Sequence, residues 1–220
     1  MPAYQSYQLC AVRFARLDSA GAPVAGAANG YVLLTSQTLT VGFESEEGTE
    51  VVSKSGCGNV VSSLKGADAT KRATGTLTVL DTDYALMALV LGGTLLGTPS
   101  APSGWLAPAL DAIAPNICLE FWTKAIEGSS QVIDPATTPD PTWFHAVIPR
   151  TTWTIGETTY EDDLGVVPLD FQGFENLNIT ADGPFNDWPT AVVTAGGARR
   201  VFNSFYDGDV PTTEGPVAVP

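Results

Sequence analysis

Short segments rich in β-branched and aromatic residues run through most of the chain, and Gly, Pro, Asn and Asp cut them at frequent intervals. In several segments apolar and polar residues alternate. In residues 7–16, for example, Cys10, Val12 and Phe14 fall on one side of an extended chain. A period of two, bounded by turn residues, is typical of half-buried β-strands. The sequence therefore predicts a mainly β fold.

The same pattern places the individual strands. We expect strands at residues 7–16, 31–43, 51–54, 60–64, 73–80, 117–126, 142–148, 151–160, 166–173, 177–181 and 199–205. The third and fourth of these segments contain VVSK and VVSS, which flank the turn sequence SGCGN, and glycines permit the positive φ angles of a tight reversal. A hairpin is therefore expected here, with a longer excursion of the chain as the alternative.

One segment, DTDYALMALVLGG at residues 81–93, has helical rather than strand periodicity. Asp81 or Thr82 is the expected N-cap, Leu86 and Leu89 recur at helical spacing, and Gly92 follows the last turn. The sequence predicts one short amphipathic helix at about residues 82–91. Its apolar face is expected to close one end or side of a β-sandwich, and a partner or membrane contact is the alternative.

A length of 220 residues is compatible with one domain or two small ones, and we expect a single domain spanning residues 1–220. Segments rich in Gly, Pro, Ser and small residues predict long loops at about residues 44–59, 93–116 and 128–141, and an extended C-terminal arm at residues 206–220. Loops of this length are usually functional. The loops are therefore the first place to look for contacts with partners.

The formal net charge is −14, and it is unevenly distributed. Residues 127–220 carry 14 acids and three bases, and no base lies between Arg150 and Arg199. A nucleic-acid backbone is bound by clustered Lys and Arg, so the chain is not expected to bind one. It also has no stretch of ~20 apolar residues and no signal-peptide pattern at its start, which favours a protein made in a cytosol, without a membrane partner.

Catalytic and metal-binding patterns are weak. One histidine and three separated cysteines do not supply the ligand spacing of a zinc site. His145 is expected to be packed on a strand, and Cys57 has four glutamates nearby instead of the positive charge that activates a thiol. The acids at residues 161–163 and 207–209 suggest calcium binding, although neither group has the ligand spacing of an EF-hand, and paired carboxylates also suggest glycoside hydrolysis. We therefore expect no enzyme, no cofactor and no resident metal.

Several stretches together resemble the major tail tube proteins of long-tailed, non-contractile bacteriophages, particularly those of actinobacterial phages. They are GCG followed by KGADATKRATGTLTVL, the helix DTDYALMALVLGG, GWLAPALDAIAPNICLEFWTKAI, and VIPRTTWTIGETTYEDDLGVVPLDFQGFENLN. They span about two thirds of the chain. None of them is a catalytic motif, and their specificity comes from their occurrence together in this order.

This resemblance implies a β-sandwich or barrel-like fold with a flanking helix, in a virion protein that self-assembles into stacked hexameric rings. Strands of neighbouring subunits would form one closed barrel around the lumen of the tail. DNA would pass through that lumen without specific binding. The implied partners are further copies of the chain, the tape measure protein, and the tail terminator and distal tail proteins. The implied location is the virion tail, assembled in the host cytoplasm.

Two groups of residues are candidates for the work of such a tube. An inter-subunit or inter-ring loop would contain Glu44, Glu46, Glu47, Glu50 and Cys57. Lumen-facing acids would come from the base-free region, with the candidates Glu157, Glu161, Asp162, Asp163, Asp170 and Glu175. An acidic wall repels phosphates, whereas a basic wall would hold the passing DNA.

Three other interpretations compete with the tube. A carbohydrate-binding or adhesion module would use tryptophans in or near loops, namely Trp105, Trp143, Trp153 and Trp188. A capsid decoration or tail terminator protein would share the virion origin. A hydrolase would use Glu161, Asp162 or Asp163, although no substrate suggests itself.

Overall fold

The computed structural model describes residues 4–54, 60–65, 69–80, 83–127, 143–157, 166–180, 182–189, 200–207 and 209–220. Its main element is a nine-stranded antiparallel sheet in the order β13-β2-β1-β9-β10-β11-β6-β3, with β12 paired to β10. The strands are β1 (Tyr4–Leu17), β2 (Gly26–Leu33), β3 (Ser36–Glu46), β6 (Ala69–Val79), β9 (Asn116–Glu127), β10 (Trp143–Ile155), β11 (Val167–Gly173), β12 (Asn203–Asp207) and β13 (Gly215–Val219). The expected mainly β fold is confirmed.

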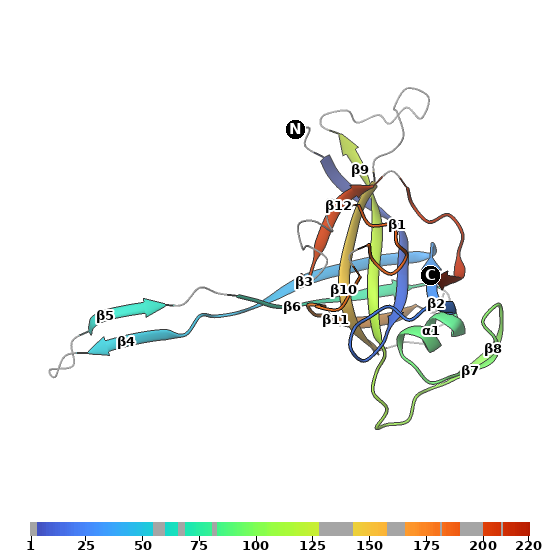
Figure 1. Ribbon diagram of the computed structural model, residues 1–220, viewed down its shortest axis with the longest axis horizontal. Coiled ribbons are helices and arrows are strands. Elements are labelled where there is room, and N and C mark those ends of the chain that lie inside the picture. The colour runs from blue at the N-terminus through green and yellow to red at the C-terminus, as the bar shows by residue number, and fades with distance from the viewer. Residues whose placement is uncertain are drawn as a thin grey trace.

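The sheet bends back on itself, so that β3 and β6 cross over β1, β9 and β10 (Figure 1). The main core fills the space enclosed by this bend, where Phe14, Leu77, Leu119 and Trp153 are all buried. These side chains project inward because alternate residues of each strand share one face. The result is a sandwich-like body built from one strongly curved sheet.

A second, smaller core covers the outer side of the central strands. Cys118 and Val147 on β9 and β10 pack there against Ile179 and Trp188, which belong to the segment that follows β11. The central strands are therefore buried on both faces. This explains why ICLEFW and FHAVI read as nearly continuous apolar runs and not as clean alternation.

The helix α1 (Tyr84–Val90) confirms the expected helix at this place in the chain. It begins two residues later than expected, because Asp83 is the N-cap and its carboxylate accepts hydrogen bonds from the amides of Ala85 and Leu86. The two N-caps expected from the sequence, Asp81 and Thr82, lie outside the described residues. The buried side of α1, which includes Leu86 and Val90, packs against the main core.

Four strand predictions are wrong in detail. Residues 31–43 belong to two strands, β2 and β3, which a break at residues 34–35 separates. The strands expected at 142–148 and 151–160 are one strand, β10, that continues through Pro149. A register shift between Ile148 and Thr151 forms a bulge there, which is one of the few places where a sheet accepts proline. Residues 177–180 form turns instead of a strand.

The expected loops also contain regular structure. Residues 93–116 include a hairpin of β7 (Thr94–Thr98) and β8 (Ala101–Leu106). The C-terminal arm returns to the body, where β13 pairs with β2. The expected loop at 128–141 lies outside the described residues. No helix in the described part of the chain is long and apolar enough to cross a membrane.

Candidate assembly surface

A long two-stranded hairpin extends from the body (Figure 1). Strands β3 and β6 form its base and remain paired as far as Glu46 and Ala69. Further out, β4 (Glu50–Lys54) pairs with β5 (Val60–Lys65). This pairing confirms the hairpin expected from VVSK and VVSS. We call residues 43–72 the arm.

Four of the five candidate contact residues lie along the described part of the arm. Glu44 accepts a hydrogen bond from Arg72 at 2.7 Å, and Glu46 lies 3.8 Å from the Lys71 ammonium. Exposed ion pairs of this kind contribute about 0–1 kcal/mol to stability, so the two acids are not required for the stability of the chain itself. Glu50 accepts from the Ser63 hydroxyl at 2.5 Å, and Glu47 is exposed. The fifth, Cys57, lies outside the described residues.

The arm also exposes apolar surface. More than half of the Phe43 side chain is exposed, with one edge against Phe202 at a ring-centroid distance of 5.5 Å, and Val52 is exposed further out. A two-stranded ribbon with no core of its own is marginally stable in water. The arm therefore has the properties of a segment that gains stability by packing against another surface.

The outer face of β3, β6, β11 and β10 forms a second surface, which is polar and rich in hydroxyl groups. Cross-strand neighbours Thr40, Thr76, Asp170 and Thr154 form one row, and Thr74, Gln172 and Thr152 form the next. All of these residues except Thr40 line a depression of about 440 Å³. We call this surface the threonine face.

Few charged groups lie on the threonine face. The Asp170 carboxylate accepts a 2.6 Å hydrogen bond from the Thr76 hydroxyl. Arg72, at the edge of the face, binds Glu44 and donates to the Gln172 amide oxygen at 3.0 Å. The surface is therefore hydrophilic with little net charge.

The candidate lumen acids are dispersed in the structure. Asp170 lies on the threonine face, and Glu157 follows the end of β10 near the same end of β11, where the Gly156 amide donates to Pro168. Glu175 lies beyond the opposite end of β11 and is exposed. Glu161, Asp162 and Asp163 lie outside the described residues. Among the described candidates, only Asp170 belongs to a continuous sheet surface.

A buried charged cluster on the outer side of β1 and β9 was not expected from the sequence. Glu120 on β9 is 1% exposed, and its carboxylate accepts from Arg13 Nε at 2.5 Å and from the Trp188 indole at 2.5 Å. Arg13 on β1 also binds Asp187, with a closest contact of 2.7 Å. The guanidinium lies between two rings, 3.9 Å from the Phe185 centroid and 4.9 Å from that of Trp122.

This cluster holds residues 182–189 against the central strands. Burial on its own lowers the pKa of Arg13, but the negative charges of Glu120 and Asp187 outweigh it and hold that pKa above its ordinary value. Gly183 permits the close approach, because its φ is +76° and a side chain there would collide with the Trp188 ring. Asp187 therefore has an internal partner and belongs to the packing of the body.

One sequence signal points to the cluster in retrospect. Glu120 interrupts the apolar run ICLEFW in a strand whose neighbours are buried, and a charge at such a position requires a partner. The partners come from positions 13 and 187, so the sequence alone does not identify them. His145, expected to be packed, is buried and stacks on Trp122 at a centroid distance of 4.0 Å.

Three of the four tryptophans that suggested sugar binding make hydrogen bonds within the chain. Trp153 and Trp188 are buried and donate hydrogen bonds to Thr151 and Glu120, respectively. Trp105 is half-buried and donates to the carbonyl of Gly92 at 2.7 Å. Trp143 is also half-buried, at the start of β10. Neither Trp153 nor Trp188 can present an open ring face to a sugar.

In the described ranges, no three side chains among His, Cys, Asp and Glu converge as metal ligands. Comparison with known proteins identifies no relative: no protein-family model matches the chain, and no curated protein matches it significantly. The arm and the threonine face are therefore interpreted from their own geometry and chemistry.

Proposed function

We propose that the chain is a structural virion protein that forms the tail tube of a long-tailed, non-contractile phage by assembling into stacked hexameric rings. The observation that carries the proposal is the arm, which extends from the body, exposes Phe43 and Val52, and has no buried hydrophobic residue among those of its side chains whose burial is described. In a stack of rings, each arm packs against a neighbouring subunit. That contact supplies the burial that the arm lacks within one chain.

The threonine face is the part of the body that lines the lumen in this proposal. DNA must slide through a tail tube without being held, and clustered Lys and Arg would hold its phosphates. A face of threonines with few charged groups gives water-compatible contact without such attraction. Asp170 adds a carboxylate to this wall, and further copies repeat it around the ring.

Edge strands favour the same arrangement. β3, with 11 residues, is the last strand on its side of the sheet, and among the described residues it pairs along one edge only, with β6. Long exposed edges promote aggregation unless they are covered or closed. Pairing of β3 with a strand of the next subunit would close the sheets of a ring into one barrel.

Truncation of the arm tests the proposal. Residues 47–68 are replaced by Asn-Gly, which joins the paired residues Glu46 and Ala69 through a two-residue turn. The body should keep its thermal unfolding midpoint, because every core residue that the structure describes as buried lies outside the deleted segment. Negative-stain microscopy of the concentrated protein should show tubes for the wild type and no tubes for the truncated chain.

A charge variant complements the truncation. Glu46→Lys with Glu47→Lys changes only side chains on the arm, and it should impair stacking. The matched control is Glu46→Gln with Glu47→Gln, which removes the charges without reversing them and should impair stacking less. Normal tubes from both the truncated chain and the Lys variant would exclude the arm as the stacking contact.

A further inference from the structure

A segment without charged residues lies at the opposite side of the body from the arm (Figure 1). Residues 84–110 contain no Asp, Glu, Lys or Arg, in a chain with 34 such residues overall (24 acids and 10 bases). This stretch comprises α1, the hairpin β7–β8 and the start of the loop that leads to β9. Protein interfaces are depleted of charge at their centres, and copies of an acidic chain repel each other least where charge is absent.

The loop after β8 projects apolar side chains into solvent. We call residues 107–114 the knob loop. A turn closed by the hydrogen bond from the Ala112 amide to the Ala109 carbonyl, at 3.0 Å, forms its tip. Leu110 and Ile113 are both fully exposed there, and Leu106 at the base of the loop is more than half exposed. Large apolar side chains grouped in this way mark an interaction site.

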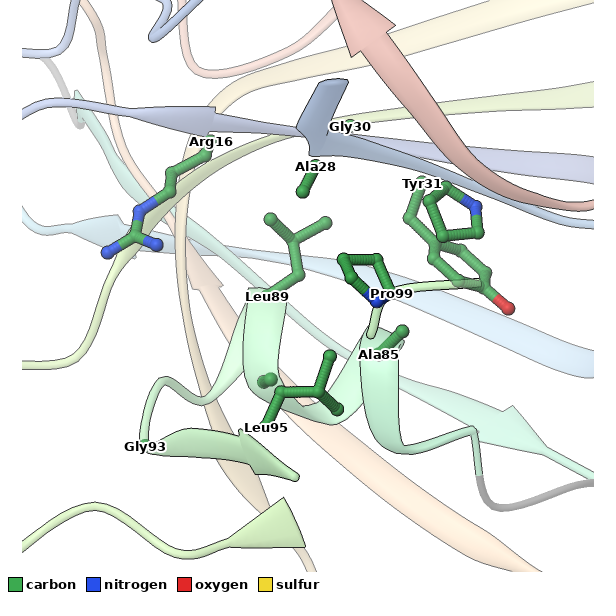
Figure 2. Close-up of a pocket in the computed structure, with 11 residues that line it drawn as sticks. Arg16, Ala28, Gly30, Tyr31, Ala85, Leu89, Gly93, Leu95 and Pro99 are labelled. Carbon is green, nitrogen blue, oxygen red and sulfur yellow. The ribbon is translucent and has the colours of Figure 1, made fainter. Parts of the chain in front are cut away.

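An apolar recess lies between α1, β2 and the hairpin β7–β8 (Figure 2). Its volume is about 250 Å³, and its walls include Ala28, Tyr31, Ala85, Leu89, Leu95 and Pro99. A protein cavity of about 150 Å³ accommodates benzene, so this recess has room for a branched aliphatic side chain. No residue of the knob loop lines the recess of its own chain.

The knob loop and the recess are complementary in charge as well as in polarity. The one charged residue of the knob loop is Asp111, which is exposed between the two apolar side chains. The one charged residue lining the recess is Arg16, at one end of it in Figure 2. Among the described residues, no ion pair to Asp111 or Arg16 is present.

We propose that the knob loop of one copy docks in the recess of a second copy, with Leu110 and Ile113 in the apolar part and Asp111 against Arg16. A knob that fits a recess elsewhere on the same molecule makes a head-to-tail contact, which generates rings when the rotation closes. This inference rests on the self-assembly in the proposed function and names a lateral contact within it. The arm takes no part in this contact.

Charge exchange tests the pair. Asp111→Arg and Arg16→Glu each put two like charges at the contact, so each should raise the protein concentration needed for association about tenfold, measured by sedimentation velocity. The double variant restores an opposite pair and should associate within about threefold of the wild type. Both positions are exposed, and unchanged thermal midpoints of the monomers will show that the fold is intact.

Removal of the knob gives an independent test. Leu110→Asp with Ile113→Asp should abolish association, while Leu177→Asp, at an exposed leucine in the body, should leave it unchanged. The proposal would be overturned if the variant with both Leu110→Asp and Ile113→Asp associated at the same protein concentration as the wild type. Failure of the double charge variant to recover would also overturn it.

The outcomes separate this contact from the tail tube itself. If the double charge variant recovers association but the wild type never stacks into tubes, the tube is wrong and the lateral contact stands. If tubes form normally from the variant with Asp at positions 110 and 113, the lateral contact is wrong and the tube stands.

Discussion

At the scale of single residues, the charged cluster of Arg13, Glu120 and Asp187 most strongly limits which substitutions the fold tolerates. Glu120 is almost completely buried and Arg13 nearly so, whereas the Asp187 side chain is 44% exposed. A buried charge that loses its partner is costly, but replacing a whole buried pair by apolar residues is often neutral. The three residues should therefore differ sharply in their response to substitution.

We expect Glu120→Ala to lower the free energy of unfolding by about 3–5 kcal/mol, because it leaves the Arg13 guanidinium buried with less compensation. Urea denaturation measures this loss. Asp187→Ala should cost less, since water reaches that carboxylate. Arg13→Met combined with Glu120→Leu should recover most of the stability. A double variant as unstable as Glu120→Ala would contradict the assignment.

Tyr31 gives a prediction for pH dependence. Burial, and then the hydrogen bond from its hydroxyl to Asp83, raise the pKa of Tyr31 in the folded protein. The unfolded chain loses the phenolic proton near pH ~10, while the folded chain keeps it. Above that pH the unfolded state binds fewer protons, so stability falls as pH rises.

Tyr31→Phe should make the fall in stability between about pH 10 and 11.5 shallower, although it also removes the hydrogen bond to Asp83. Urea midpoints at a series of pH values provide the measurement. Burial also raises the pKa of the Cys118 thiol, so a residual fall of the same sign is expected in the variant. An unchanged slope would show that Tyr31 does not keep its proton in the folded state.

At the scale of elements, the sequence predicted what depends on local patterns. Alternation identified β1, β9 and β11, and the glycine-rich turn identified the pairing of β4 with β5. It did not predict that β10 continues through Pro149, because the bulge that permits this depends on pairing with β9. Residues 177–180 resembled a strand because Ile179 is apolar, but that side chain is buried in the second core.

The candidate surfaces were predictable to different degrees. The acids of the arm stand out in the sequence, whereas the threonine face exists only through the register of four strands that are distant along the chain. Gly75 is an example of a position whose role depends on strand pairing and is not visible in the sequence. A side chain at this position would meet the Thr40 carbonyl and the Phe171 ring, and both contacts come from neighbouring strands.

Helix α1 depends on its cap. Seven residues are too few for a helix to be stable alone, so packing and the Asp83 carboxylate must hold it. We expect Asp83→Ala to cost about 1–2 kcal/mol in urea denaturation. Asp83→Asn is the matched control, because asparagine caps helices about as well, and it should cost clearly less. Equal losses would show that capping is not what Asp83 contributes.

At the scale of the whole molecule, net charge opposes assembly. In the proposed hexameric ring, six copies with a formal charge of −14 each would carry −84 in total. Self-repulsion of this size must be overcome by the arm and by uncharged contacts. The distribution of charge is consistent with this, since residues 84–110 carry none while residues 127–220 carry most of the excess.

Raising the ionic strength should therefore favour assembly. The screening length falls from about 30 Å at 0.01 M to about 8 Å at 0.15 M salt, which weakens repulsion between copies. We expect the concentration at which tubes appear to fall over this range, as measured by pelleting at high speed. Assembly that weakens with added salt would indicate that attraction between opposite charges dominates.

The central claim is that this chain forms a hollow tube. Electron microscopy of the concentrated wild-type protein, with helical reconstruction, tests it most directly. We predict stacked rings with the arm of each subunit in contact with the adjacent ring and with the threonine face, including Thr76, Thr154 and Asp170, lining the lumen. A chain that stays monomeric at every concentration and ionic strength, or a tube with the threonine face outside, would contradict the account.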